Sequence, residues 1–222
     1  MIFHTAADIR CYELWYDMFY NSVKTHCPSS QTSFHFVGRD AIKTDADLFS
    51  QDQISLEEIQ SQYNVDEKSA KGYYCISRFL SIPCVGDHVL LCDIDLKLIR
   101  NFDTTTIESW LEEHPAINFC RLKFNGKPGG MMAMLLRKDI CQSVRDYANT
   151  LIKQSSLWWG LDSEVRKYIY ETYSVKNYIS LYNIGTPTQN PSMDECLFVY
   201  HKKNNKDRHA GKDIELKSFK TA

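Results

Sequence analysis

An apolar run that ends in two closely spaced aspartates constrains this chain more than any other feature. Residues 89–92 predict a strand buried on both faces, and Asp93 and Asp95 follow it with only Ile94 between them. An ionised carboxylate is costly to bury without a partner. A divalent cation bound by both carboxylates, with phosphate oxygens completing its coordination, would keep both charged. The alternative is a strand that ends in a solvated Asp-x-Asp turn.

Length, charge and cysteine content narrow the class of protein. The 222 residues are 43% hydrophobic, enough for a substantial core. A net charge of -2 gives no overall field that would recruit nucleic acid or an anionic membrane. The eight cysteines show no zinc-site spacing and fit reduced thiols. With no signal peptide and no transmembrane run visible, we expect a soluble protein of a bacterial cytoplasm, or of the host cytoplasm of a virus.

The first forty residues predict a strand–helix–strand unit, with strands over 2–7 and 33–37 and a helix over about 12–23. Such a unit implies a parallel sheet, whose ligands bind at the carboxyl ends of the strands, here residues 5–8 and 38–40. Residues 43–64 are polar and predict a surface helix with loops. Further patterns predict helices over 73–82, 106–111, 139–153 and 162–173, and strands over 117–122 and 197–200.

Two charged residues stand out in apolar surroundings. Arg78 is a strong cation in an otherwise apolar helical segment, and Asp162 lies among large apolar groups where a helix is expected to begin. If the aspartates bind a metal and phosphates, Arg78 becomes a contact for phosphate or substrate. The alternatives are a structural ion pair for Arg78 and a helix N-cap for Asp162.

The glycine pair near residue 130 and a late histidine are two further candidate site features, and each has a structural alternative. Gly129 and Gly130 precede an apolar segment and would let backbone and ligand approach closely, although their spacing matches neither a Walker loop nor a dinucleotide fingerprint. A surface turn is the alternative. His201 ends a short apolar strand ahead of a cationic segment, and a lone histidine is more often structural than a ligand.

Together, the initial strand–helix–strand unit, the Asp93-Ile94-Asp95 motif, the glycine pair and the late strand ending in His201 resemble a GT-A-type glycosyltransferase. The chain is most similar to the small retaining group that includes glycogenin and the bacterial lipopolysaccharide galactosyltransferases. The resemblance implies an α/β fold: a single Rossmann-like GT-A domain over residues 1–222, with a central, mostly parallel sheet flanked by helices. Residues 1–100 would form the nucleotide-binding half and 101–222 the acceptor-side half with a metal-binding tail.

The resemblance also implies a role for each matching residue. Asp95 would be the main ligand of Mn²⁺ or Mg²⁺, Asp93 would share the metal and reach the ribose, and His201 would be a third protein ligand. Arg78 would contact the donor sugar beside Asp162, and these two are the expected catalytic residues. The other expected contacts with the nucleotide sugar come from Thr5, Ala6, Ala7, Asp8, Tyr12, Ile94, Gly129, Gly130 and Lys206.

Two positions depart from the pattern of the group. The tail reads His201-Lys202-Lys203-Asn204-Asn205-Lys206, without the usual glycine and with altered spacing, so more than one lysine could reach the diphosphate. Ser163 follows Asp162, where a glutamine is common.

The implied function is metal-dependent transfer of a hexosyl or pentosyl group from a nucleotide sugar, expected to be a UDP-sugar, with retention. The acceptor would be a glycan, a lipid or a protein. One alternative is a non-catalytic protein that binds a nucleotide sugar or glycan. The other is a phosphohydrolase of the haloacid dehalogenase type, for which the motif should lie near the N-terminus and Thr or Val should replace Lys97.

Overall fold

A computed structural model describes residues 1–122, 128–154, 156–158, 160–184 and 196–201. At residues 104, 121–122, 128–132, 182–184 and 200–201 it describes the backbone alone. Within these ranges, no helix is both long and apolar enough to cross a bilayer.

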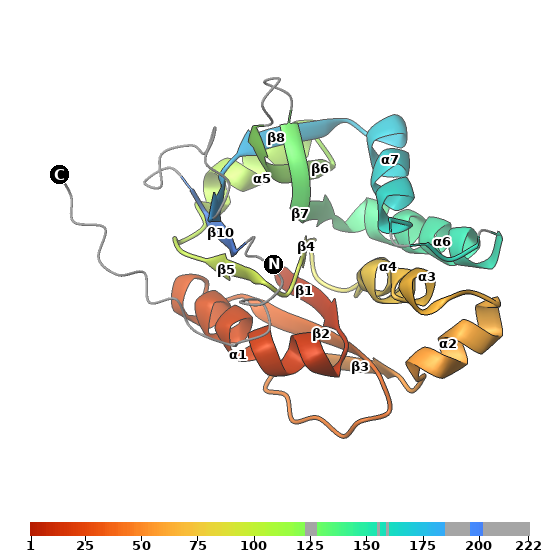
Figure 1. Cartoon of the computed structure of the whole chain (residues 1–222). Coiled ribbons are helices and arrows are strands. Elements are labelled where there is room, and N and C mark those ends of the chain that lie inside the picture. The colour runs from red at the N-terminus through yellow and green to blue at the C-terminus, as the bar shows by residue number, and fades with distance from the viewer. Residues whose placement is uncertain (123–127, 155, 159, 185–195, 202–222) are drawn as a thin grey trace.

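A mixed sheet of seven strands forms the centre of the described structure (Figure 1), in the order β3-β2-β1-β4-β7-β6-β8. Parallel pairs join β1 to β2 and β4, β2 to β3, and β6 to β8, while β7 runs antiparallel to both β4 and β6. The expected mostly parallel sheet is therefore confirmed. The strands are β1 (Ile2–Ala7), β2 (Gln31–Val37), β3 (Leu48–Asp52), β4 (His88–Cys92), β6 (Ala116–Leu122), β7 (Pro128–Arg137) and β8 (Val175–Ile179).

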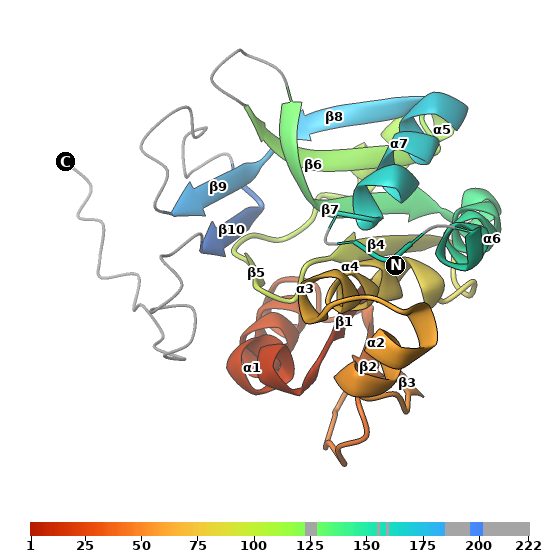
Figure 2. The ribbon, with the colours of Figure 1, turned by 45° about the vertical axis from the view of Figure 1, so that its right-hand side comes forward.

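A second, three-stranded sheet lies to one side of the first (Figure 2), in the order β5-β10-β9. It consists of β5 (Leu96–Leu98), β9 (Leu181–Ile184) and β10 (Phe198–His201). Because β5 follows the aspartate pair directly and pairs with β10, this sheet brings the end of the described chain back to that motif.

Helices cover both faces of the main sheet. On one face, α1 and α5 pack with Phe3 and Leu90 in one apolar cluster. On the other, α2, α4, α6 and α7 pack with Val89 and Leu91 in a second cluster. Since β4 contributes alternate residues to both clusters, it is buried on both faces, as predicted. The helices are α1 (Ile9–His26), α2 (Leu56–Tyr63), α3 (Glu67–Ala70), α4 (Gly72–Leu80), α5 (Thr104–Glu113), α6 (Lys138–Gln154) and α7 (Asp162–Thr172).

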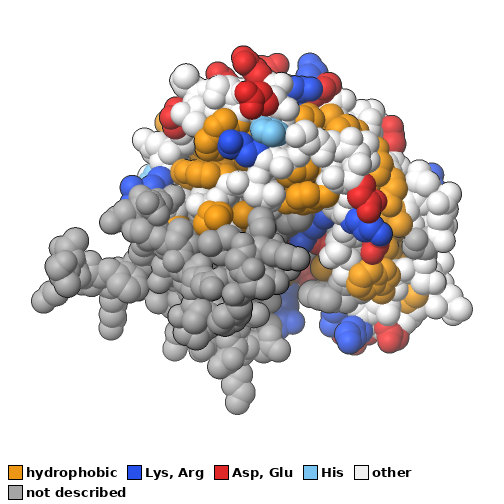
Figure 3. All heavy atoms as spheres, turned by 90° about the horizontal axis from the view of Figure 1, so that it is seen from above, with side chains coloured by type: hydrophobic (Ala, Val, Ile, Leu, Met, Phe, Trp, Pro, Cys, Tyr) orange, Lys and Arg blue, Asp and Glu red, His pale blue; other side chains and the backbone are white. Residues whose placement is uncertain are grey.

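Several boundaries differ from the sequence prediction. The first helix begins at residue 9 rather than near 12, because the Asp8 side chain caps it by accepting from the backbone N–H of Cys11 at 2.8 Å. Residues 43–64 contain a strand, β3, as well as the expected helix, and β5, β7, β8 and β9 were not predicted as strands. Seen from above, side chains of both charge signs are interspersed over the visible face (Figure 3).

Candidate functional site

The topology gathers several of the predicted residues at one edge of the main sheet. Since β1, β2 and β4 are parallel, their carboxyl ends share an edge, and the antiparallel β7 begins there. We call this the carboxyl edge. Asp8 follows β1, Asp93 follows β4, and the backbone of Gly129 and Gly130 lies at the start of β7. Ligands of open α/β sheets bind at such an edge.

The aspartate motif forms a tight turn between the two sheets. The backbone N–H of Leu96 donates to the carbonyl of Asp93 at 3.2 Å, and both Ile94 and Asp95 are buried. Tyr200 of β10 pairs with Leu96 in the antiparallel ladder, so His201 occupies the next register position, alongside Asp95. The His201 side chain lies outside the described residues, so the structure places only its backbone beside the aspartate turn.

Arg78 links the aspartate motif to α7. From the last turn of α4, its Nη1 contacts Oδ1 of Asp93, and its Nη2 donates to Oδ2 of Asp162 at 3.0 Å. Arg166 contacts the same Oδ2 at 2.6 Å from one helical turn further along α7. The Arg78 side chain therefore does form ion pairs, as the structural alternative expected, and it forms them with two of the predicted site residues.

Asp162 does not cap its helix. The residue in the N-cap position of α7 is Leu161, which makes no side-chain capping bond, and Asp162 is the first helical residue. Its carboxylate instead faces the two arginines, because two buried guanidinium groups need an anionic partner more than the helix end does. The N-cap interpretation of Asp162 is wrong.

Burial shapes the electrostatics of this group. It lowers the pKa of Arg78, as does the nearby Arg166, whereas Asp162 and Asp95 act in the opposite direction. Burial also lowers the pKa of Arg166, and Asp162 opposes that shift. Cys75 faces the same charges one turn before Arg78, and burial raises its thiol pKa to about 11, so it is neutral near pH 7. Arg166 and Cys75 were not predicted from sequence. Their helical spacing places them on the same helix faces as Asp162 and Arg78, but it does not indicate that they are buried.

The end of β1 adds another carboxylate. Asp8 acts electrostatically on both Tyr74 and Cys75 of α4, so it faces the same group of charges. The buried Thr5 has a hydroxyl oxygen without a hydrogen-bond partner in the described structure. Ala6 and Ala7 follow it at the end of the strand.

Tyr12 serves a structural contact in this structure. Its hydroxyl donates to the carbonyl of Lys43, and its ring lies 5.6 Å from that of Phe34. Burial raises the pKa of Tyr12, and Asp17 and Asp45 raise it further. Tyr12 therefore ties α1 to the loop that follows β2, beside the region expected to hold a base. Lys206 lies outside the described residues.

The charge balance of this edge fits a divalent cation. The four carboxylates named above (Asp8, Asp93, Asp95, Asp162) and the two guanidinium groups (Arg78, Arg166) have a summed charge of -4 + 2 = -2. No three His, Cys, Asp or Glu side chains of the described part gather closely enough to hold a metal by themselves. Mg²⁺ is commonly bound by one or two carboxylates and substrate phosphates, so the pair Asp93 and Asp95 suits such a cation.

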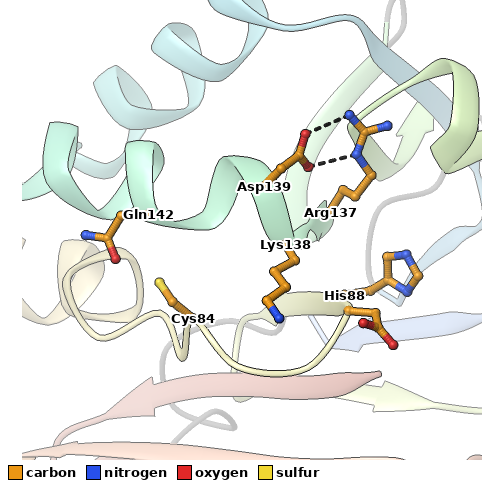
Figure 4. Close-up of a pocket in the computed structure, with 7 residues that line it drawn as sticks. Cys84, His88, Arg137, Lys138, Asp139 and Gln142 are labelled. Atoms are coloured by element: carbon orange, nitrogen blue, oxygen red, sulfur yellow. Dashed lines mark hydrogen bonds and ion pairs between the residues drawn. The ribbon is translucent and has the colours of Figure 1, made fainter.

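An open hollow at the opposite end of β4 has different chemistry (Figure 4). On one side of it, Arg137 donates to Asp139 in two contacts of 2.7 Å, so the two side chains neutralise each other. This hollow contains none of the predicted site residues. It is lined by Cys84, Asp87, His88, Arg137, Lys138, Asp139 and Gln142.

Comparisons with known proteins support the fold. No family model matches the sequence. No curated protein matches it either. Among solved structures, the chain is similar to the galactosyltransferase LgtC in complex with donor and acceptor sugar analogues: 13% identity, 91% of this chain and 87% of that one, TM-score 0.53. It is also similar to an active-site mutant of LgtC: 12% identity, 92% and 88%, TM-score 0.52. The predicted GT-A fold, and the predicted resemblance to galactosyltransferases of this type, are confirmed.

Proposed function

We propose that this chain is a metal-dependent glycosyltransferase that moves a hexosyl or pentosyl group from a UDP-sugar to a glycan, lipid or protein acceptor, with retention. One observation carries the proposal: Asp93, Arg78 and Asp162 are joined by ion pairs at the carboxyl edge of a GT-A fold. The structural neighbour LgtC, solved in complex with donor and acceptor sugar analogues, supports the same interpretation.

Sugar transfer breaks the bond between the anomeric carbon and a diphosphate, so negative charge grows on the leaving group. Mn²⁺ or Mg²⁺ held by Asp93 and Asp95, with His201 as a third ligand, would supply Lewis-acid stabilisation of that charge. Arg78, fixed at its position before the reaction, adds a positive charge that requires no reorganisation during bond cleavage. Lys206 or a neighbouring tail lysine would offset the remaining phosphate charge.

Asp162 is placed to orient the donor sugar rather than to attack it. Both arginines contact its Oδ2, and its Oδ1 would accept a hydrogen bond from a sugar hydroxyl. Two guanidinium groups on one carboxylate also stabilise its charge and make it a weaker nucleophile. Its role is therefore to hold the sugar where Arg78 and the diphosphate act on it.

The remaining predicted residues divide between the two ends of the donor. Asp8, with the backbone of Thr5, Ala6 and Ala7, would hold the uridine at the end of β1, with Tyr12 near the base. Ile94 would contact the nucleotide from the aspartate turn. Gly129 and Gly130 would leave room where donor sugar and acceptor meet. Residues 1–100 would thus bind the nucleotide, and 101–222 the acceptor.

The first test is thermal unfolding with UDP, with and without Mn²⁺. A ligand at 100 times its dissociation constant should stabilise the folded state by about 2.7 kcal/mol. We expect a stabilisation that needs both UDP and Mn²⁺ and that Asp95→Asn removes. Asp87→Asn, an exposed carboxylate at the other end of β4, is the matched control and should behave like the wild type. No shift with UDP plus Mn²⁺ would rule out a uridine donor.

Turnover separates the enzyme from a non-catalytic binding protein. We expect hydrolysis of at least one UDP-sugar, abolished by EDTA and restored by Mn²⁺. Binding of UDP and Mn²⁺ without any turnover across a panel of UDP-sugars would favour the binding protein instead. The phosphohydrolase alternative has less support, because the aspartate motif follows β4 and not the first strand.

A further inference from the structure

Asp162 is shared by two arginines from different helices. Arg78 of α4 and Arg166 of α7 reach its Oδ2 at 3.0 and 2.6 Å, with side chains only 12% and 19% exposed. Arg78 divides its charge between Asp162 and another carboxylate, so it balances neither of them completely. Burying a second guanidinium beside it is costly, and the reason for its presence must include that shared charge.

The reason lies in the other partner of Arg78. Its guanidinium is a fork, with Nη1 on Asp93 and Nη2 on Asp162. Arg166 weakens the Asp162 side of this fork in two ways: it takes part of the charge of Asp162, and it repels Arg78 directly. Both effects shift Arg78 toward Asp93.

We propose that Arg166 is a positioning residue that sets how Arg78 divides its interaction between Asp162 and the metal-binding Asp93. The inference rests on the proposed function. With Arg166 in place, Arg78 competes with the cation for Asp93, which limits metal affinity, and it stays beside the diphosphate where it can act. Without Arg166, Arg78 moves from Asp93 toward Asp162. Asp93 is then free to bind the cation, but Arg78 and Asp162 no longer lie in the correct positions at the donor sugar.

Substitutions of Arg166 and of Asp162, the two neighbours of Arg78 in α7, should therefore change Mn²⁺ affinity in opposite directions. Arg166→Met should tighten Mn²⁺ binding by about fivefold, an effect of the size seen between coupled neighbouring residues. Asp162→Asn should weaken it, since Arg78 then rests on Asp93 alone. Both should lower kcat for UDP-sugar hydrolysis, by about 10–100-fold, as is typical when a residue that orients an active group is lost.

The experiment measures Mn²⁺ binding by isothermal titration calorimetry in saturating UDP, and kcat and KM for UDP-sugar hydrolysis, on the full chain. Arg166→Lys keeps the charge and should fall between wild type and Arg166→Met. Lys167→Met is the matched control: the neighbouring side chain is 63% exposed and its nearest carboxylate, Glu171, is 3.9 Å away. It should match the wild type in both measurements.

The outcomes are distinct. Weaker Mn²⁺ binding in Arg166→Met, or unchanged binding, would overturn the proposal, because a purely structural arginine would lower affinity and kcat together. If Arg166→Met does not fold, Asp162→Asn and Arg166→Lys still decide it: tighter or equal Mn²⁺ binding in Asp162→Asn contradicts the competition. A wild type that neither binds Mn²⁺ with UDP nor turns over any UDP-sugar would instead refute the proposed function itself.

Discussion

Gly72 begins α4 at a point where another part of the backbone passes too close for a side chain. A Cβ there would lie 2.3 Å from the carbonyl oxygen of Trp158 and 2.7 Å from its carbonyl carbon. Both are backbone atoms of the segment that leads into α7, so they cannot rotate away. This contact sets the separation between the helix that carries Arg78 and the helix that begins with Asp162.

Replacing Gly72 with Ala should therefore destabilise the protein. At a solvent-exposed position inside a helix, replacing Gly with Ala stabilises the folded state by up to about 1 kcal/mol. Here we expect a loss of about 1–3 kcal/mol, the usual cost of forcing extra atoms into a packed site. Urea unfolding measures the change, with Ser61→Ala on the exposed face of α2 as the control. A Gly72→Ala protein as stable as the wild type would show that the two segments separate easily.

Single residues of the candidate site could be predicted from sequence only where their own surroundings were unusual. Arg78 and Asp162 stood out as charges in apolar segments. The hydrogen bond between them joins residues 84 positions apart, and no local pattern indicates such a contact. Arg166 lies in a polar helical segment that looks like an ordinary solvated surface, so only the packing of α7 against α4 reveals that it is buried.

At the scale of secondary-structure elements, Asp47 links β3 to β2 and α1. It immediately precedes β3, and its Oδ2 accepts from the backbone N–H and the hydroxyl of Thr32 in β2 at 2.7 and 2.9 Å. The same oxygen accepts from Lys24 of α1 at 2.9 Å. The Thr32 backbone N–H and Lys24 lower the pKa of Asp47 to about 2. This carboxylate therefore anchors the edge strand β3 to β2 and α1.

Asp47→Asn should destabilise the protein at neutral pH by about 1 kcal/mol. This is small for the loss of hydrogen bonds to a charged group, because solvent screens the charge of a half-exposed carboxylate. The folded-state pKa lies below the unfolded value of about 3.9, so the stabilisation is fully present above pH 4 and disappears toward pH 2. Denaturant unfolding at pH 7 and pH 3 should show the difference between the two proteins shrinking. Asp45→Asn, an exposed carboxylate nearby, should have little effect.

The strands that could be predicted differ physically from those that could not. β1, β2 and β4 lie inside the sheet and bury nearly every residue, so they appear as apolar runs. β3 and β8 are the two edges of the sheet, and they leave most residues partly exposed. Their sequences mix polar and apolar residues, and only pairing with a neighbouring strand makes them strands. In the second sheet, the apolar β10 was predicted, whereas β5 and β9 were not, and both pair with β10.

For the whole molecule, the rule that parallel strands share a carboxyl edge predicted residues 5–8 and 38–40 as a ligand-binding edge from sequence. The parallel pairing of β1 with β4 in the structure adds residues 93–95 to that edge. The antiparallel β7 adds Gly129 and Gly130, and β10 returns His201 to the aspartate turn. What could not be predicted is how the helices on one face pack, because that depends on side chains brought together from distant segments. A buried histidine at that interface illustrates this.

His4 lies between the main sheet and α4 and is fully buried. Its Nε2 is 3.1 Å from the carbonyl of Arg78, which can only accept, so Nε2 carries the proton. Its Nδ1 lies 2.9 Å from the hydroxyl of Ser33 and, in the neutral ring, accepts from it. His4 thereby holds one of the free carbonyls at the end of α4 and fixes the backbone of Arg78.

The protonation of His4 should make the stability of the whole molecule depend on pH. Burial, and then the nearby His35, lower its pKa from 6.5 to about 3. Between these values the unfolded chain binds a proton that the folded protein does not, so the free energy of unfolding should fall by about 1.4 kcal/mol for each pH unit below 6.5. Urea unfolding between pH 7.5 and 4.5 measures this slope. His4→Gln can still donate to the Arg78 carbonyl but cannot titrate, so it should lose stability at pH 7.5 and show a shallower slope. Equal slopes in the two proteins would mean that His4 becomes protonated in the folded protein, and that the carboxyl end of α4 moves to accommodate the charged ring.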